Sequence, residues 1–313
     1  MRAIAIDAFG PAEDLRLRDV PDPKVGPDSV LIRVRAAGVN PVDAAIRRGA
    51  LEPAFPHHFP LIPGWDVAGV VEAVGPAVVD LEPGDEVYAY ARKTEIAEGT
   101  YAELVSLPAG MVARKPRKLS FAEAAAIPLA GLTAYQALTE ALGVVRHETL
   151  LVTAAAGGVG HFAVQIARHL GADVVGTAGT ANQEFVRGLG AEPVDYAAGG
   201  VTAAVRTLQP GGIDAVLDMV GGDGQDQARA ALRPGGRIAS IVDTDPAKGA
   251  EGVSGHYVFV RPSAKELYEL ASLADEGLLV PEIADVLPLE QAAEAHRRIE
   301  DGHVRGKLVL EVG

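Results

Sequence analysis

Short apolar segments, punctuated by proline and glycine, fill the chain up to about residue 120. Residues 29–39 (SVLIRVRAAGV) and 66–75 (DVAGVVEAVG) are predicted strands, and 82–90 (EPGDEVYAY) is predicted to be a turn followed by a strand. Short strands at close spacing, with turn residues between them, are typical of a barrel or a sandwich. We therefore expect the first part of the chain to be rich in β-structure.

The pattern changes around Ser120, where an Ala- and Leu-rich stretch begins. Ser120 and Glu123 fit a capping box, which predicts a helix start. From residue 149 apolar strand patterns (TLLVTA, DVVGTA, PVDY, IDAVLDMVG, RIASIV) alternate with helical ones. This alternation predicts a doubly wound parallel sheet with right-handed crossovers and helices on both faces. Two amphipathic helices follow, of which EAHRRIEDGH is expected to face water, and the last strand, GKLVLEV, is expected to pair with the first domain.

Composition narrows the classes of function. The 313 residues allow one large domain or two medium ones, and the net charge of −14 disfavours binding to nucleic acid or anionic membranes. No apolar run is long enough to span a membrane, and the first residues lack an export segment, so a cytoplasmic location is expected. Cysteine is absent, which excludes disulfides and thiol catalysis and removes the usual ligands of structural zinc.

A glycine-rich turn follows the first strand of the alternating region, within TAAAGGVGHFAVQIARHLGA (153–172). Its spacing, Ala155-x-Gly157-x-x-Gly160, matches the dinucleotide fingerprint with Ala in the first place. Gly157 would let the backbone approach a pyrophosphate, and Gly160 would let the helix pack close to the strand. A turn kept only for packing explains three glycines poorly, because they cost backbone entropy. S-adenosylmethionine binding would leave the β-rich first part unexplained.

The second strand of this region indicates which dinucleotide is bound. An enzyme specific for NAD would end this strand with an acid that binds the ribose 2′-hydroxyl. Gly176 and Thr177 stand there instead, and Asp173 lies at the beginning of the strand. The missing charge, together with the hydroxyls of Thr177 and Thr180, leaves room for a 2′-phosphate and favours NADP(H). No Lys or Arg follows at once.

Further stretches accompany the glycine turn in order along the chain: GVNPVDAAIRRG, PLIPGWDVAGVVEAVG, GDEVYAY, GTYAE, AAAIPLAGLTAYQAL, LDMVGG, LRPGGRIASI and RGKLVLEV. Together they resemble the zinc-independent medium-chain reductases, the quinone oxidoreductase and enoyl reductase group. The resemblance covers essentially the whole chain. It implies a GroES-like β-barrel domain (1–121 and 259–313), a Rossmann domain (122–258) inserted into it, and a cleft that holds NADPH.

The same resemblance implies the reaction and its residues. Members typically reduce the C=C bond of an enone or quinone and are often homodimers. Asn40 and Thr133 would lie by the nicotinamide, and Tyr196 would flank the 2′-phosphate. The implied cofactor-binding residues are Asn40, Thr133, Ala156, Gly157, Gly158, Val159, Thr177, Ala178, Tyr196, Val220, Ile241, Phe259 and Lys307.

The chain differs from zinc-dependent relatives of the family, and these differences indicate whether a catalytic zinc is expected. Zinc-dependent relatives carry Cys and a Gly-His-Glu stretch where this chain has Asn40 and Gly64-Trp65-Asp66, and their four-Cys lobe is missing. We therefore expect no catalytic zinc. The adjacent His57 and His58 do not share a helical face and are expected in a solvated loop. Where NADPH-preferring members often have Lys, this chain has Asn182 and Gln183.

No catalytic acid or base stands out in the sequence. Asp43 is expected to cap a helix, Asp66 to make a structural hydrogen bond, and Tyr88 and Tyr90 to pack on a strand, although one of these tyrosines could donate a proton. Two alternatives stay open: a metal-free alcohol or aldehyde dehydrogenase, and a non-catalytic NADPH-binding protein of this fold.

Overall fold

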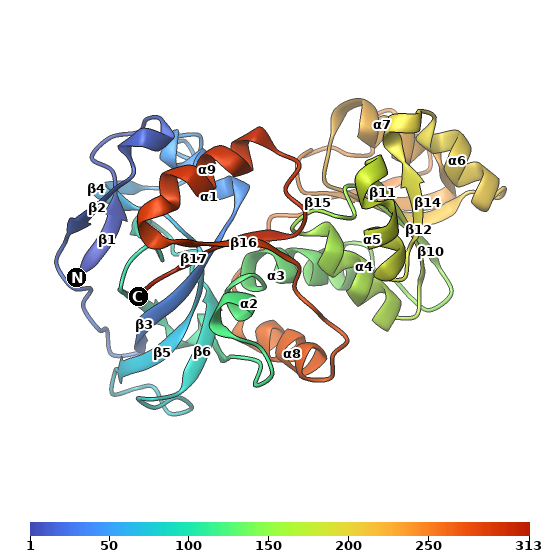
Figure 1. The fold of residues 1–313 in the computed structure, drawn as a ribbon. Helices are drawn as coiled ribbons and strands as arrows, with labels where there is room; N and C mark the ends of the chain where they lie inside the picture. The colour runs from blue at the N-terminus through green and yellow to red at the C-terminus, as the bar shows by residue number, and fades with distance from the viewer. The chain divides into compact units, whose positions relative to one another are not determined.

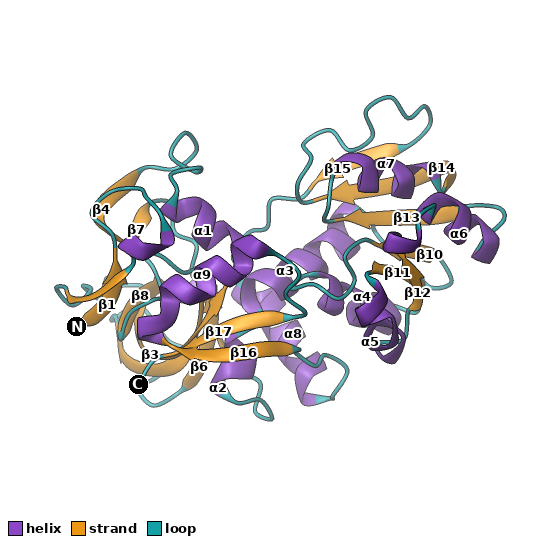
Figure 2. Cartoon of the chain, turned by 45° about the horizontal axis from the view of Figure 1, so that its top comes forward, coloured by secondary structure: helices purple, strands orange, loops and turns teal.

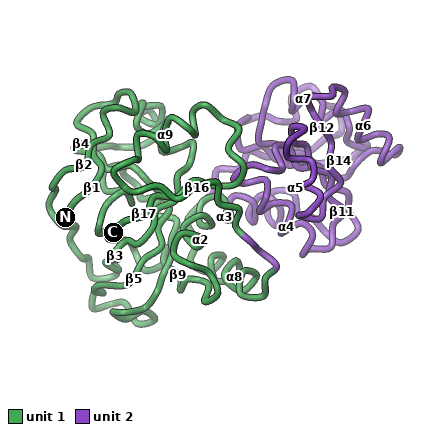
Figure 3. The backbone as a smooth tube through the Cα atoms, viewed as in Figure 1, with its two compact units in different colours: residues 1–132, 261–277, 281–313 green, residues 133–260, 278–280 purple.

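The computed structural model describes all 313 residues, which form two compact units (Figure 3). The first unit comprises residues 1–132, 261–277 and 281–313, and the second comprises 133–260 and 278–280. Both chain ends thus build one unit, and the middle of the chain builds the other. The units divide at 132/133 rather than at the expected 121/122, because the helix that starts at Phe121 packs against strands of the first unit.

The first unit is mainly β-structure (Figure 1). Its strands are β1 (Arg2–Ala5), β2 (Arg16–Asp19), β3 (Ser29–Val39), β4 (His57–Ile62), β5 (Asp66–Val74), β6 (Glu86–Tyr90), β7 (Ile96–Glu98), β8 (Leu104–Pro108), β9 (Val112–Arg114), β16 (Ile283–Pro288) and β17 (Lys307–Glu311). Its helices are α1 (Pro41–Arg47), α2 (Phe121–Ala125), α8 (Ala264–Asp275) and α9 (Ala292–Asp301). Helix α3 (Pro128–Gln136) contains the division between the units.

Strand β3 organises the main sheet of the first unit, whose strand order is β16-β17-β3-β5-β6-β9. Its first half pairs with β8, its second half pairs with β17, and β5 follows its other edge. Alternate residues of the first half are buried and then exposed, whereas Ala36–Val39 are all buried, as expected for a strand that becomes covered on both faces. The antiparallel pairing of β17 with β3 confirms that the last strand returns to the first domain.

Two histidines expected in a loop belong to strand β4. His57 begins this strand and aligns with Ile96 of β7 in a parallel pair. The segment HHFPLI does not alternate, and its short apolar run contains Pro60, which disfavours a strand, so its strand character comes from a distant partner rather than from a local pattern. His58 is exposed, and its Nε2 lies 3.3 Å from the Glu95 carboxylate.

The second unit contains one six-stranded sheet in the order β12-β11-β10-β13-β14-β15. The strands are β10 (Thr149–Val152), β11 (Asp173–Ala178), β12 (Glu192–Asp195), β13 (Ile213–Asp218), β14 (Leu232–Ser240) and β15 (Ser254–Tyr257), and every neighbouring pair is parallel. Its helices are α4 (Gly160–His169), α5 (Gln183–Gly188), α6 (Val201–Leu208) and α7 (Gly222–Ala230). The doubly wound sheet expected from the sequence is confirmed.

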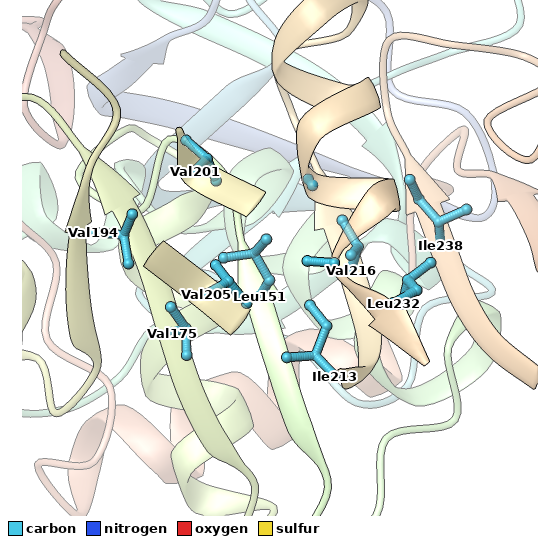
Figure 4. Packing of buried hydrophobic residues seen from close by; sticks show 11 residues of the cluster. Leu151, Val175, Val194, Val201, Val205, Ile213, Val216, Leu232 and Ile238 are labelled. Atoms are coloured by element: carbon cyan, nitrogen blue, oxygen red, sulfur yellow. The ribbon is translucent and has the colours of Figure 1, made fainter. Parts of the chain in front are cut away.

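Helices cover both faces of this sheet (Figure 2). Val175 of β11 packs in a buried cluster with Val201 and Val205 of α6 and with residues of α7 (Figure 4). The next residue, Gly176, faces the opposite side, because a β-carbon there would meet Val186 of α5 at 2.8 Å. Successive residues of a strand point to opposite faces, so α5 and α6 lie on different sides of the sheet.

Strand β15 was not expected from the sequence. Its four residues are all exposed, and they pair only with β14 at the edge of the sheet. None of the helices combines the length and apolar character that crossing a membrane would require.

Candidate functional site

The glycine-rich turn lies between β10, which ends at Val152, and α4, which begins at Gly160. At Gly160 a β-carbon would lie 2.2 Å from the Ala154 carbonyl oxygen and 2.8 Å from the Ala155 Cα. Only glycine allows this approach of helix to strand. The close packing that the fingerprint predicts at Gly160 is therefore present.

Gly157 has different surroundings. A β-carbon there would meet only the Ala154 carbonyl oxygen, at 3.2 Å, a close contact that a small backbone shift would relieve, so packing within the chain requires a glycine far less than at Gly160. The neighbouring backbone N–H groups of Ala156, Gly158 and Val159 have no hydrogen-bond partner within the chain. Free N–H groups at the start of a helix of ten residues form a site for an anionic group. This geometry fits the diphosphate of a dinucleotide, and a side chain at Gly157 would fill the space beside it.

Thr177 holds the turn against β11. Its carbonyl oxygen accepts from the Ala155 N–H at 2.8 Å, and its hydroxyl accepts from the Ala154 N–H at 3.2 Å. Ala154 adopts a left-handed conformation (φ +47°), which brings both N–H groups toward Thr177. Thr177 is buried, so its side chain supports the turn from within the protein.

A buried carboxylate, that of Asp218 at the end of β13, joins the ends of three neighbouring strands. It accepts hydrogen bonds from the Ser240 hydroxyl (2.8 Å) at the end of β14 and from the Gln225 amide (3.2 Å) of α7. Its other oxygen accepts from the backbone N–H of Val220 at 3.1 Å and the Thr153 hydroxyl at 3.4 Å. Asp218 therefore fixes the loop that carries Val220 beside the glycine-rich turn.

Apolar side chains are left exposed just beyond the ends of these strands. Val220 follows β13 and is 55% exposed, and Phe259 follows β15 and is 53% exposed. Ile241, directly after β14, is partly exposed. The carboxyl ends of parallel strands share one edge of the sheet, so these residues lie along the edge that carries the glycine-rich turn. Exposed apolar groups at such an edge are a typical ligand-binding surface.

A carboxylate of the neighbouring strand β12 lies beside the end of β11, whose own sequence has no acid there. Asp195 of β12 is aligned with Ala178 of β11, and it accepts a hydrogen bond of 2.6 Å from the Thr180 hydroxyl. This hydrogen bond lowers the pKa of Asp195. The Gln183 amide donates to the Ala178 carbonyl at 2.8 Å, and Tyr196 is half-exposed with its hydroxyl near Gly179. The Thr180 hydroxyl, expected to help a 2′-phosphate, thus already has a charged partner.

A second group of buried polar residues belongs to the first unit and begins at Asn40. Asn40 precedes α1, and its backbone N–H donates to the Asp43 carboxylate at 2.8 Å in a capping box. The helix-capping role expected for Asp43 is confirmed. The Asn40 side chain donates from Nδ2 to Asp66 at 2.9 Å and accepts at Oδ1 from the Lys307 ammonium. Asn40 and Lys307, both of which are expected to bind the cofactor, are therefore in direct contact.

The network continues from Asp43 toward the surface of the first unit. The Tyr101 hydroxyl donates to Asp43 at 3.1 Å and lies 3.3 Å from His296 Nε2. His296 Nδ1 lies 3.4 Å from a nitrogen of Arg47, which in turn donates to the Glu300 carboxylate at 2.7 Å. Burial raises the pKa of Asp43 to about 7, and burial together with the Arg47 charge lowers that of His296 to about 3.

Several residues of this network were missed by sequence reasoning. His296 and Arg47 are buried, although the helix with His296 was expected to face water. The charged residues around these two positions predict an exposed helix face. Arg47 can be buried because its guanidinium forms an ion pair with Glu300 of a distant segment, and no local sequence pattern indicates that pair. Tyr88 and Tyr90 are buried on β6, as strand packing predicts, and the Tyr88 hydroxyl donates to the Leu267 carbonyl. Thr133 lies in α3 and is also buried.

No group of three His, Cys, Asp or Glu side chains lies close enough together to hold a metal ion. Asp66, which stands in place of the acid of the Gly-His-Glu stretch of zinc-dependent relatives, accepts hydrogen bonds from the Leu129 N–H at 2.7 Å and from Asn40. Its carboxylate is thus engaged in the structural role expected from the sequence.

Comparison with known proteins agrees with these features. Residues 26–117 match the family "Alcohol dehydrogenase GroES-like domain", and residues 189–310 match the family "Zinc-binding dehydrogenase". The chain is 34% identical over 326 residues to the chloroplast envelope quinone oxidoreductase homolog of Arabidopsis thaliana, covering 99% of this chain and 98% of that protein. It is 34% identical over 325 residues to an NADPH-dependent alkenal/one oxidoreductase of the same plant (99% and 79% covered).

Solved structures give the same result. A quinone oxidoreductase from Coxiella burnetii superposes with a TM-score of 0.90 at 35% identity, covering 100% of this chain and 99% of that one. An NAD-dependent alcohol dehydrogenase superposes with a TM-score of 0.91 at 37% identity, covering 100% of both chains. The chain belongs to the zinc-independent medium-chain dehydrogenases/reductases, in the quinone oxidoreductase and enoyl reductase group, whose enzymes use a nicotinamide cofactor.

Proposed function

We propose that this protein is an NADPH-dependent reductase that transfers hydride to the C=C bond of a quinone or an α,β-unsaturated carbonyl compound without a metal. The observation that carries the proposal is the glycine-rich turn, whose free N–H groups and open space at Gly157 fit a diphosphate. The names of the two plant relatives, a quinone oxidoreductase homolog and an alkenal/one oxidoreductase, support the substrate class.

Support for NADPH comes from the end of β11, where Gly176 and Thr177 replace an acid, and from Tyr196, which is free to flank a 2′-phosphate. Asp195 acts against it, because an ionised carboxylate repels a phosphate. We therefore expect a preference for NADPH that is small enough to be altered by one charge.

The bound cofactor supplies the hydride, and the protein supplies binding and orientation. The N–H groups of Ala156, Gly158 and Val159 would hold the diphosphate, and Val220, Ile241 and Phe259 would cover the apolar part of the ligand. Asn40, Lys307 and Thr133 are proposed to lie by the nicotinamide. The carboxylates of Asp43 and Asp66 are engaged with hydrogen-bond donors of the chain, so we assign the proton that completes the reduction to water.

A metal-free alcohol or aldehyde dehydrogenase is the second candidate, favoured by the similarity to the NAD-dependent alcohol dehydrogenase. Absorbance of reduced nicotinamide distinguishes the candidates when NADPH is mixed with 1,4-benzoquinone, a 2-alkenal, a 2-alkenone and a saturated aldehyde. The proposal expects oxidation with the first three. Turnover with the aldehyde alone would favour the second candidate, and tight binding without turnover would indicate a non-catalytic protein.

We also propose that the protein forms a homodimer through β15. All four residues of this edge strand are exposed, and the aromatic side chains of Tyr257 and Phe259 are exposed at its end. An uncovered strand edge offers free backbone groups to a second copy. Sedimentation should give twice the chain mass, and Tyr257→Pro, which removes a backbone N–H that points away from β14, should shift it toward the monomer. The cytoplasmic location stays a prediction of the sequence.

A further inference from the structure

The carbonyl oxygen of Gly157 accepts two hydrogen bonds from a single residue, His161. The His161 backbone N–H donates to this oxygen at 3.1 Å, and the ring nitrogen Nδ1 lies 2.9 Å from it. A carbonyl oxygen can only accept, so Nδ1 must carry the hydrogen of the second contact. The His161 ring is therefore held in a form in which Nδ1 is the donor.

The His161 ring is fully buried on the first turn of α4. It packs against the ring of Phe162, with 3.9 Å between the ring centroids, and the His161 carbonyl oxygen accepts from the Gln165 amide at 2.9 Å. A side chain without exposed surface does not touch a ligand that binds at the surface of the turn. An effect of this ring on binding must therefore pass through the groups that it holds, of which the Gly157 carbonyl belongs to the turn.

The Gly157 carbonyl sets the direction of the next N–H group. The peptide bond between Gly157 and Gly158 is trans, so its C=O and N–H point in opposite directions. The C=O points along α4 toward His161, and the Gly158 N–H therefore points out of the amino-terminal end of the helix. Gly158 is partly exposed, and its N–H has no partner within the chain. A buried ring thus orients a free donor at the surface.

Both residues that flank this peptide lack a β-carbon. Contacts of the β-carbon normally restrict the rotation of a peptide plane, and between two glycines little of this restriction remains. A peptide turned over would direct its carbonyl oxygen outward, where the oxygen would repel an anion. The backbone N–H of His161 opposes this rotation, and the ring Nδ1–H adds a second hydrogen bond to the same oxygen.

We propose that His161 is a positioning residue of the dinucleotide site, which holds the Gly157–Gly158 peptide so that the Gly158 N–H is directed at the diphosphate. This role rests on the proposed function. Thr177 holds the first half of the turn through two backbone N–H groups, and His161 holds the second half. The turn is thus fixed from both sides, by β11 and by α4.

The hydrogen bond is tested in the ligand-free protein, so this result does not depend on activity. A long-range ¹H–¹⁵N correlation spectrum of the ¹⁵N-labelled chain distinguishes a ring nitrogen that carries a hydrogen from one that does not. It is recorded at about pH 8, where an ordinary imidazole is neutral. The His161 signals are assigned by their loss in His161→Asn. We expect Nδ1 to carry a hydrogen, and a ring with its only hydrogen on Nε2 would overturn the proposal.

Two substitutions test the effect on binding. His161→Leu removes the ring donor, whereas the amide nitrogen of His161→Asn can take the place of Nδ1 and donate to the same carbonyl. We expect the NADPH dissociation constant to rise about tenfold in His161→Leu, the effect of weakening one hydrogen bond to a charged group, and to be largely restored in His161→Asn. An unchanged constant in His161→Leu, or an equal rise in both variants, would overturn the positioning role.

Turnover separates this role from an effect on the reaction itself. The diphosphate does not change during hydride transfer, so the Gly158 N–H binds it equally in the ground state and the transition state. Both variants should therefore keep the wild-type kcat with 1,4-benzoquinone at saturating NADPH, while KM for NADPH rises in His161→Leu. A lower kcat with an unchanged KM for NADPH would contradict the proposal.

The control for stability alone is Ile166→Val, which shortens a buried side chain further along α4 and leaves both donors of the Gly157 carbonyl in place. It should lower the unfolding midpoint and leave the NADPH dissociation constant unchanged. A comparable rise of this constant in Ile166→Val would show that His161 acts only on the stability of α4. A wild type that does not bind NADPH would remove the proposed function and this role with it, but not the hydrogen bond detected by NMR.

Discussion

The carbonyl oxygen of Ala154 lies 2.2 Å from the position that a β-carbon on Gly160 would occupy. The carbonyl belongs to the backbone of the turn, and the β-carbon would be attached to the backbone of α4. The two could move apart only if α4 separated from β10. A β-carbon on Gly157, three residues earlier, would have only one atom of the chain within 4 Å. Packing of α4 on β10 requires the glycine at position 160, whereas the proposed binding of a diphosphate requires the glycine at position 157. Substitutions at the two positions distinguish these roles.

Gly160→Ala should destabilise the protein by about 3 kcal/mol, the upper part of the range for overpacking a rigid site. Chemical denaturation with a fluorescence or circular dichroism signal measures this loss. Gly188→Ala is the matched control, since a β-carbon at Gly188 of α5 would meet nothing within 4 Å, and it should leave stability unchanged or raise it slightly. Equal stabilities of the two variants would contradict the close contact.

Asp195→Asn should tighten the binding of NADPH by about three- to tenfold, the effect of removing one exposed charge near a phosphate, and should change NADH binding less. An Asn in this place still accepts from the Ala197 N–H, as Asp195 does at 2.8 Å, so the local cap is kept. Titration by nicotinamide fluorescence gives both dissociation constants.

The control for this prediction is Asp173→Asn, which makes the same charge change at the opposite end of β11. It should leave the ratio of the two constants unchanged. The effect of Asp195→Asn should also diminish as salt is added. A ratio that changes equally in the two variants would mean that Asp195 does not lie near the 2′-position.

Asp43 should make stability depend on pH. Burial raises its pKa in the folded protein to about 7 from its usual 3.8, so the folded state keeps a proton that the unfolded chain releases. The contribution is fully present below pH 3.8 and is lost as the pH rises through 7, by about 4 kcal/mol at most.

The measurement compares the free energies of unfolding of the wild type and of Asp43→Asn between pH 4 and 8. The Asn side chain does not titrate in this range and keeps an oxygen that can accept from the Asn40 N–H and the Tyr101 hydroxyl. The advantage of the wild type should decrease toward pH 7 and then stay constant. The contribution of His296, whose pKa is lowered to about 3, has the opposite sign and cancels between the variants to the extent that it is unaffected by the substitution. A difference independent of pH would contradict the raised pKa of Asp43.

The sequence predicts those parts of the fold that have a local cause. Strand β3 alternates, the β10-turn-α4 unit contains its glycines, and the capping boxes at Asn40 and Ser120 are each contained within four residues. Strands β4 and β15 have no such pattern. All residues of β15 are exposed, and its strand conformation depends on hydrogen bonds to β14, which only the folded chain provides.

The candidate site follows the same division. The turn residues that we propose to bind a diphosphate could be recognised from spacing alone. The alignment of Asp195 with Ala178 depends on sheet register, and the contact of Asn40 with Lys307 joins residues at opposite ends of the chain. Sequence reasoning assigned the Thr180 hydroxyl to a 2′-phosphate because the partner supplied by the neighbouring strand is not visible in a local pattern.

The central claim is that the glycine-rich turn binds the diphosphate of a nicotinamide dinucleotide. It is tested most directly by titrating the wild type and Gly157→Val with NADPH while nicotinamide fluorescence and the unfolding midpoint are followed. We predict saturable binding by the wild type, and binding weakened by about 10- to 100-fold in the variant, the equivalent of one lost hydrogen bond to a charged group, with the unfolding midpoint retained. Equal affinity of the two proteins for NADPH would contradict the claim.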